Sequence, residues 1–128
     1  TFGTAQAAAF TVANTTLNGN ALLLKVANGS TTNPNDWIRV QVTGSQVNVQ
    51  TTPNSGGAYT AAIGSPLTGT VANGDVVTAR VDANGIVYVW ANTAFLGAVQ
   101  TTFTGSGRIG IQLPSGARVD NFAGGNAP

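Results

Sequence analysis

Four Asn-Gly pairs constrain the fold of this chain more than any other feature; they stand at residues 18–19, 28–29, 73–74 and 84–85. Both residues tolerate the positive φ angles of tight hairpin turns, so Asn-Gly between alternating apolar segments indicates a β-hairpin. Together with other Gly, Pro and Asn clusters, these breaks recur about every 8 to 12 residues, as is typical of a sandwich or barrel. No window has the apolar periodicity of an amphipathic helix. The sequence therefore predicts an all-β domain.

Alternating apolar and polar positions predict the strands, over residues 6–13, 20–27, 36–42, 46–51, 58–62, 76–82, 86–91, 95–100, 108–113 and 118–123. Residues 33–35 and 53–57 are predicted loops, because Pro and Gly interrupt strand pairing. Residues 86–90 are apolar on both faces, as a central strand would be. We expect one domain over residues 1–123 and a flexible tail over residues 124–128.

The chain carries few charges, since only 7% of its residues are Asp, Glu, Lys or Arg and the net charge is +1. The basic residues are scattered and form no stripe of the kind that nucleic-acid binding requires. No apolar run approaches the roughly 20 residues of a membrane span. The absence of Cys excludes disulfides and thiolate metal sites. A composition rich in Thr, Asn and Gly and free of Glu favours a secreted or cell-surface protein, and a start at Thr1 without Met indicates a mature product or an excised fragment.

Enzymatic activity is not expected from the acids and bases that are present. Glycoside hydrolysis needs two carboxylates at a defined separation, and the four Asp residues of this chain stand in separate segments. No His is available as a general base. Residues 105–110 spell G-x-G-x-x-G, but between predicted strands rather than at the start of a helix, so no phosphate loop is indicated.

Several short motifs follow one another from about residue 20 onward: LLLKV at 22–26, IRV at 38–40, NGDVV at 73–77, IVYVWAN at 86–92, LG at 96–97, GRIGI at 107–111 and ARVDNF at 117–122. In this order they resemble the laminin-G-like, concanavalin-A-like jelly-roll domains of bacterial exoproteins. The resemblance implies two antiparallel sheets packed face to face, one of them concave, and a role in glycan binding or adhesion. Domains of that family carry an additional N-terminal edge strand, so the resemblance also implies that this chain lacks one and has an open groove or an unpaired edge.

Large amphipathic aromatic residues make a candidate glycan site, because aromatic faces pack on the apolar C–H faces of sugars while amides and Arg supply hydrogen bonds. We predict ligand-binding roles for Trp37, Arg39, Arg80, Tyr88 and Trp90, with a glycan or cell-surface polysaccharide as partner. If their strands are neighbours in one sheet, the three rings form one platform. The alternative is that Tyr88 and Trp90 fill the core between the sheets. All five Phe residues are expected in the core or as caps over it: Phe2, Phe10, Phe95, Phe103 and Phe122.

Two charged residues raise further alternatives. Asp120 matches the aspartate of the family's last strand, which in some relatives lies near calcium, so the resemblance implies a calcium site there; the alternative is a turn-capping or Arg-paired Asp. No other cofactor is expected. Lys25 stands in an apolar run, where it faces solvent, pairs with an Asp or forms an isopeptide cross-link with an Asn.

Two functions from different classes follow from these observations. The first is a non-catalytic binding module that attaches a larger exoprotein to glycan. The second is a structural subunit that polymerises by strand addition into a filament or surface layer. Little surface charge opposes association, the predicted edges lack Lys and Glu, and residues 1–13 are the predicted donor or swapped strand.

Overall fold

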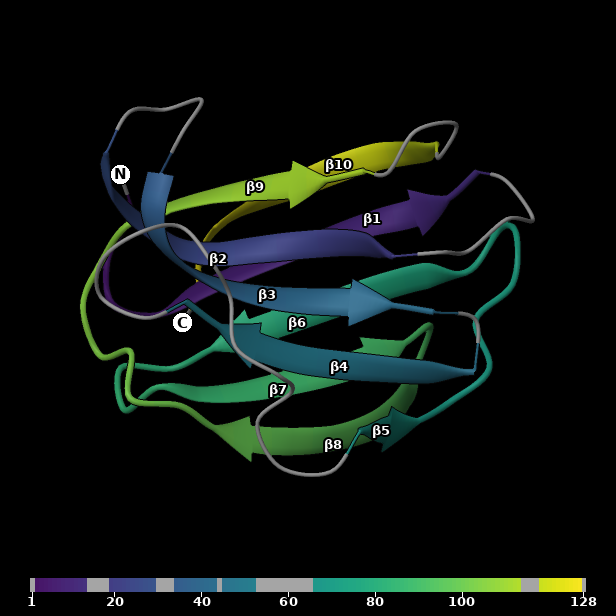
Figure 1. Cartoon of the computed structure of the whole chain (residues 1–128). Coiled ribbons are helices and arrows are strands. Elements are labelled where there is room, and N and C mark those ends of the chain that lie inside the picture. The colour runs from purple at the N-terminus through teal and green to yellow at the C-terminus, as the bar shows by residue number, and fades with distance from the viewer. Residues whose placement is uncertain are drawn as a thin grey trace.

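The computed structural model describes residues 2–13, 19–29, 34–43, 45–52, 66–113 and 118–127. They form two antiparallel sheets of five strands each, packed face to face (Figure 1). None of the described residues is helical. The strands are β1 (Gln6–Val12), β2 (Asn20–Gly29), β3 (Pro34–Val42), β4 (Gln46–Thr51), β5 (Leu67–Thr68), β6 (Val76–Val81), β7 (Ile86–Ala91), β8 (Ala94–Gln100), β9 (Arg108–Gln112) and β10 (Val119–Asn126). The predicted all-β sandwich is confirmed.

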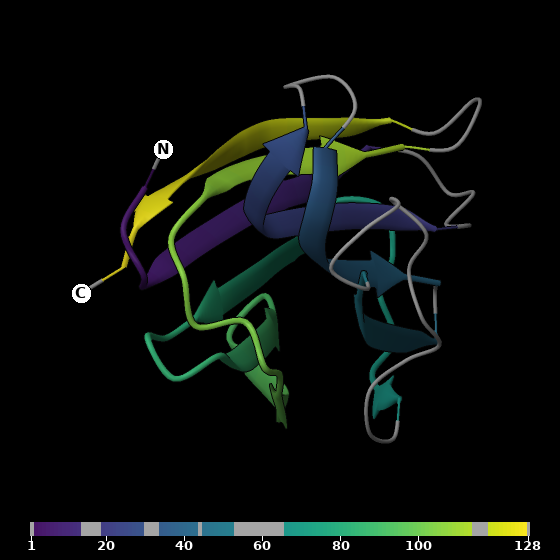
Figure 2. The same ribbon diagram turned by 60° about the vertical axis from the view of Figure 1, so that its left-hand side comes forward.

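The order of the strands in each sheet determines which strands lie at the edges of the sandwich. The first sheet runs β10-β1-β6-β7-β8 and the second runs β5-β4-β3-β2-β9. On one side of the sandwich, the edge strands β9 and β10 lie next to each other in both views (Figures 1 and 2). On the opposite side, Leu67 of β5 packs against β8, where a side chain added to Gly97 would come within 2.7 Å of it. The sandwich is therefore closed by packing on the β5 side.

Strand β1 lies inside the first sheet and pairs with β10 on one side and β6 on the other. Its alternation places Phe10 and Val12 between the sheets, where both are buried. The amide of Ala127 donates to the carbonyl of Ala5 at 2.9 Å, so the two ends of the described chain lie side by side. The described residues 2–13 are thus paired within their own chain. A role of this segment as a donor or swapped strand between copies stays a prediction from the sequence.

The core consists of small and branched apolar side chains from the inward positions of both sheets. The strictly alternating burial of β1 and the inward Val residues of β4, β6 and β7 follow directly from the two-residue period of a strand. Fully buried inward residues include Leu22, Leu24, Ile38, Val40, Val47, Val77, Val81, Val87 and Val89. Each such side chain stabilises the fold by about 1.5–3 kcal/mol relative to exposure. Ile38, Val40 and Val42 of β3 share the inward face and are fully buried, as the two-residue period requires.

The hairpin between β6 and β7 forms at the Asn-Gly pair that predicted it. The amide of Gly85 donates to the carbonyl of Asp82 at 3.1 Å, and Gly85 has φ +85°. A side-chain carbon at Gly85 would come within 2.8 Å of the carbonyl oxygen of Thr101. Gly is therefore required here both for the backbone angle and for the space.

The structure differs from the predicted segments in three places. Strand β3 begins at Pro34, so the predicted loop 33–35 is wrong for Pro34 and Asn35; Pro is tolerated at the first strand residue, where a missing N–H removes little pairing. Strand β10 continues through Asn126, so the predicted tail is wrong for residues 124–126, which pair with β1. The short β5 was not predicted, and the predicted strand 58–62 lies outside the described residues.

Candidate functional site

The five residues predicted to bind glycan do not come together. Trp37 and Arg39 lie on β3 of the second sheet, whereas Arg80 lies on β6 and Tyr88 and Trp90 lie on β7 of the first sheet. In both sheets these residues alternate with core residues and point outward, so the two groups occupy opposite faces of the sandwich. The condition for a single platform of three rings, that their strands are neighbours in one sheet, is therefore not met.

Tyr88 and Trp90 point away from the core, which decides between the two alternatives for these rings. Their neighbours Val87 and Val89 fill the inward positions of β7, while Tyr88 and Trp90 are half-buried on the outer face. The ring centroids of Tyr88 and Trp90 lie 6.4 Å apart with 26° between the ring planes. A third ring, Phe95 of β8, lies 5.5 Å from Trp90 with 54° between their planes.

We call Tyr88, Trp90 and Phe95 the aromatic row. Phe95 was expected in the core or as a cap, but 55% of it is exposed. A register shift in the pairing of β7 with β8 places Phe95 directly opposite Trp90, on the outer face. Simple alternation cannot predict that shift.

Arg80 and Asp82 both contact Tyr88, at one end of the aromatic row. The guanidinium of Arg80 lies 5.7 Å from the centre of the Tyr88 ring, at cation–π distance. The Tyr88 hydroxyl donates to Oδ2 of Asp82 at 3.3 Å. Oδ1 of Asp82 accepts from the amides of Ile86 and Asn84, both at 2.9 Å. These hydrogen bonds, first that from Ile86, and the nearby Arg80 charge hold the pKa of Asp82 below its usual value.

A shallow groove lies beside the aromatic row on the same face. It has a volume of about 340 Å³ and is lined by small residues of β1, β6 and β10, including Ala7, Ala9, Thr78, Ala123 and Gly125. Thr78 pairs directly with Trp90, so the groove borders the aromatic row. Arg80 is the one charged residue among the outward positions of β1, β6, β7 and β8, all of which the structure describes.

On the second sheet, Trp37 and Arg39 are buried by their surroundings, with 8% and 5% exposed. Nε of Arg39 donates to Oε1 of Gln50 at 2.7 Å, and Nη1 donates to Oε1 of Gln112 at 2.9 Å. The guanidinium thus connects β3 with β4 and β9. These two predicted ligand residues present little surface to a partner, and the candidate site retains only Arg80, Tyr88 and Trp90 of the predicted five, with Phe95 added.

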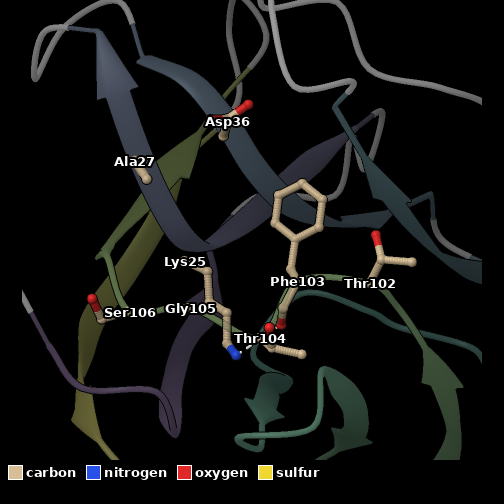
Figure 3. A pocket seen from close by; sticks show the side chains of 8 residues that line it. All are labelled: Lys25, Ala27, Asp36, Thr102, Phe103, Thr104, Gly105 and Ser106. Carbon is tan, nitrogen blue, oxygen red and sulfur yellow. Dashed lines mark hydrogen bonds between the residues drawn. The ribbon is translucent and has the colours of Figure 1, made fainter.

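A second cavity, of about 390 Å³, lies between the β2–β3 end and the loop of residues 102–106 (Figure 3). Lys25 lines it but is only 2% exposed, so the predicted solvent-facing position is wrong. The ladders of β2 are interrupted here and Lys25 has φ +51°, which breaks the alternation that the prediction used. Its Nζ donates to the carbonyls of Asp82 at 3.0 Å and Phe103 at 2.8 Å. Burial lowers the pKa of Lys25, against the opposing effect of the Asp82 charge.

The remaining predicted site residue is Asp120, which is exposed on the edge strand β10 opposite Thr11. Among the described residues, no three potential metal-ligating side chains form a group. A calcium site at Asp120 stays a prediction from the sequence. In the described part of the chain, no helix is long and apolar enough to cross a membrane.

No protein-family model matches the sequence, and no curated protein matches it. Among solved structures, the galectin LEC-6 of Caenorhabditis elegans is similar, with a TM-score of 0.58 and 13% sequence identity. The match covers 98% of this chain and 84% of the galectin chain. This similarity shows the fold, a jelly-roll β-sandwich of the concanavalin-A-like type.

Proposed function

We propose that this chain is a non-catalytic glycan-binding module whose binding surface is the aromatic row with Arg80. The observation that carries the proposal is the outward orientation of three neighbouring rings, with centroids 6.4 and 5.5 Å apart, on a β-sheet face. Rings held this way bury apolar sugar faces with little loss of side-chain freedom, and the neighbouring Arg80 can donate hydrogen bonds to hydroxyl groups.

Two further points support the proposal. The similar solved structure is named a galectin, and by that name it is a lectin. Two of the four aspartates have partners typical of structural turn residues: Asp82 accepts from turn amides and Tyr88, and Asp75 accepts from Ala72 and Asn92. A secreted or cell-surface location, adhesion and a relationship to laminin-G-like bacterial exoproteins belong to the same proposal, and they rest on the sequence.

The test is affinity electrophoresis and pull-down with a panel of soluble and insoluble polysaccharides. Trp90→Ala and Phe95→Ala are each expected to weaken retention by about 1–3 kcal/mol, as for aromatic anchors in other binding sites. Phe122→Ala is the matched control, because Phe122 is also an aromatic residue with 39% exposed but lies on β10, away from the row. Retention that is equal for all three variants, each with an intact β-sheet spectrum, contradicts the proposed surface.

A second candidate function, self-assembly, is favoured by one specific observation at the β9 and β10 edges. Among the residues that the structure describes, five large apolar side chains are notably exposed, and three of them, Ile111, Leu113 and Phe122, belong to these strands or directly follow β9. Edge strands present unpaired N–H and C=O groups, and proteins usually protect them with charges. On β10 the only charged residue is Asp120. We propose a second copy of the chain as the partner for this edge.

Sedimentation velocity at several concentrations and ionic strengths tests this candidate. Association is expected to increase with concentration and to be lost in Ile111→Lys, which places a charge on the exposed edge. Val76→Lys is the control, since Val76 is similarly exposed, at 36%, on a different part of the surface. A wild-type chain that stays monomeric throughout rejects self-assembly and leaves the glycan proposal unaffected.

A further inference from the structure

The aromatic row and the small-residue groove form one continuous surface. The register of the first sheet aligns one residue from every strand, in the order Ala123, Ala9, Thr78, Trp90 and Phe95. Adjacent strands lie about 4.8 Å apart, so this line spans about 19 Å across the sheet. Small side chains occupy its first three positions and large rings its last two. The surface is therefore low over Ala123, Ala9 and Thr78, which we call the floor, and rises at the rings of Trp90 and Phe95.

Two features keep the floor low: β10 packs closely against the residues beneath it, and the outward side chains are small. A side-chain carbon at Gly124 would come within 2.5 Å of Ile109, so β10 lies close against the layer beneath it. The outward positions beside it, Ala7, Ala9 and Ala123, add no more than a methyl group each. The cavity of about 340 Å³ lies over this floor and is open to the outer face.

The orientation of the rings excludes a flat rigid surface as ligand. Trp90 and Phe95 differ by 54° in ring plane, whereas Tyr88 and Trp90 differ by 26°. A planar crystalline face cannot lie flat on both members of the more tilted pair. A single glycan chain can, because rotation about each glycosidic bond turns successive sugar rings relative to one another.

Charge further narrows the class of ligand. The strands of this sheet carry two charged outward residues: Arg80 of β6, whose guanidinium lies against the ring of Tyr88, and Asp120 of β10, which pairs with the outward Thr11. Opposite charges of this number give the face no net basic character. Acidic polysaccharides are recognised by several basic groups that pair with their carboxylates or sulfates. The composition of this face matches an uncharged chain of hydroxyl groups and C–H faces.

We propose that the glycan is a neutral, soluble chain of several sugar units that lies across the strands. One end stacks on Trp90 and Phe95, and the other occupies the groove over Ala9 and Ala123. This assignment rests on the proposed glycan-binding function and specifies its ligand. It makes the groove a set of additional subsites that a single sugar or a disaccharide on the rings does not reach.

The test is isothermal titration with ladders of cello-, xylo- and malto-oligosaccharides, from the monosaccharide to the hexasaccharide. For the ladder that binds, affinity is expected to rise by about tenfold or more between the disaccharide and the tetrasaccharide, and then to level off when the surface is covered. In Ala9→Gln, a longer side chain fills the groove without touching the rings. This variant is expected to bind the disaccharide as the wild type does and to lose most of the gain from longer chains.

Ala123→Gln on the edge strand β10 is a second variant, which keeps the test decisive if a substitution in the central strand β1 prevents folding. Equal affinity for disaccharide and hexasaccharide, with binding still abolished by Trp90→Ala, overturns the extended site and leaves the glycan function intact. Tighter binding of a uronic-acid chain, or of crystalline cellulose over every soluble ladder, overturns the assigned ligand class. Binding of no carbohydrate at all rejects the proposed function itself.

Discussion

Replacing Gln6 with Met is expected to destabilise the domain by about 2–4 kcal/mol, because Gln6 joins three segments from inside the sandwich. The side chain is fully buried. Its Oε1 accepts from the backbone amide of Lys25 at 2.8 Å, and its Nε2 donates to the carbonyls of Gly3 at 3.0 Å and Gly107 at 2.9 Å. Met has similar length and volume but makes none of these hydrogen bonds, so the substitution isolates their contribution.

The expected loss of stability depends on whether the three backbone groups that bond Gln6 find other hydrogen-bond partners in Gln6→Met. Gly3 is exposed and its carbonyl can bind water, and the carbonyl of Gly107 retains the amide of Phe2 at 2.7 Å. The amide of Lys25 lies where the pairing of β2 is interrupted, and it loses its side-chain acceptor in a buried position. One buried unsatisfied donor costs about 1–3 kcal/mol, and each of the two other neutral bonds contributes about 0.5–1.5 kcal/mol, partly offset by the more apolar Met side chain.

Urea unfolding followed by tryptophan fluorescence measures this difference. With a slope of about 2 kcal/mol per molar urea, the midpoint is expected to fall by about 1–2 M. Gln100→Met is the matched control, since Gln100 is exposed while its Nε2 bonds two carbonyls, of Asn84 and Thr101. The control is expected to change stability by less than about 1 kcal/mol. Equal losses in both variants, or a Gln6→Met midpoint that matches the wild type, would refute the reasoning.

Three further predictions concern single positions. Gly85→Ala is expected to lower the melting temperature more than Gly74→Ala, because both have positive φ but only Gly85 lacks space for a side-chain carbon, which would meet Thr101. Burial lowers the pKa of Lys25 below 10.5, so between the lowered value and pH 10.5 the unfolded chain binds more protons than the folded chain. The free energy of unfolding should therefore rise with pH across that window, and this rise should disappear in Lys25→Met. Because hydrogen bonds lower the pKa of Asp82 below 3.8, its contribution is present above pH 3.8 and is lost as pH falls through the lowered value; Asp82→Asn should flatten this acid loss.

Each of these has a clear contrary result. Equal melting temperatures for the two Gly variants would show that the close approach to Thr101 relaxes without cost. A free energy of unfolding that does not change with pH up to 10.5 would contradict an effect of Lys25. A loss of stability at acid pH that is the same in Asp82→Asn as in the wild type would show that other carboxylates cause it.

The interior of the sandwich could be predicted from local patterns in the sequence. Alternation of apolar with polar residues predicted the segments that form β3 and β6, and the Asn-Gly pair at 84–85 predicted the hairpin between β6 and β7. These features depend on a strand period of two residues and on turn geometry, both of which act over a few neighbouring positions. For the same reason, the outward orientation of Tyr88 and Trp90 was one of the two alternatives available before the structure.

Local patterns failed wherever pairing is irregular. Lys25 follows the alternation of β2 only until the bulge, and there its positive φ turns the side chain into the interior. Phe95 reaches the outer face because the register of β8 shifts by one position beside Trp90. The Gly residues at 124 and 125, which suggested a tail, instead allow β10 to lie close against β1 and Ile109.

The sequence by itself determined the all-β class, the alternation within several strands and several of the turns. Only the tertiary structure decided which strands are neighbours. That order separates Trp37 and Arg39 from Tyr88 and Trp90, and it places Ala9 and Ala123 in line with the aromatic row. The physical reason is that a side chain's direction is set within its own strand, whereas strand order is set by contacts between distant segments, such as those between Gln6 and Gly107, that bury the core as a whole.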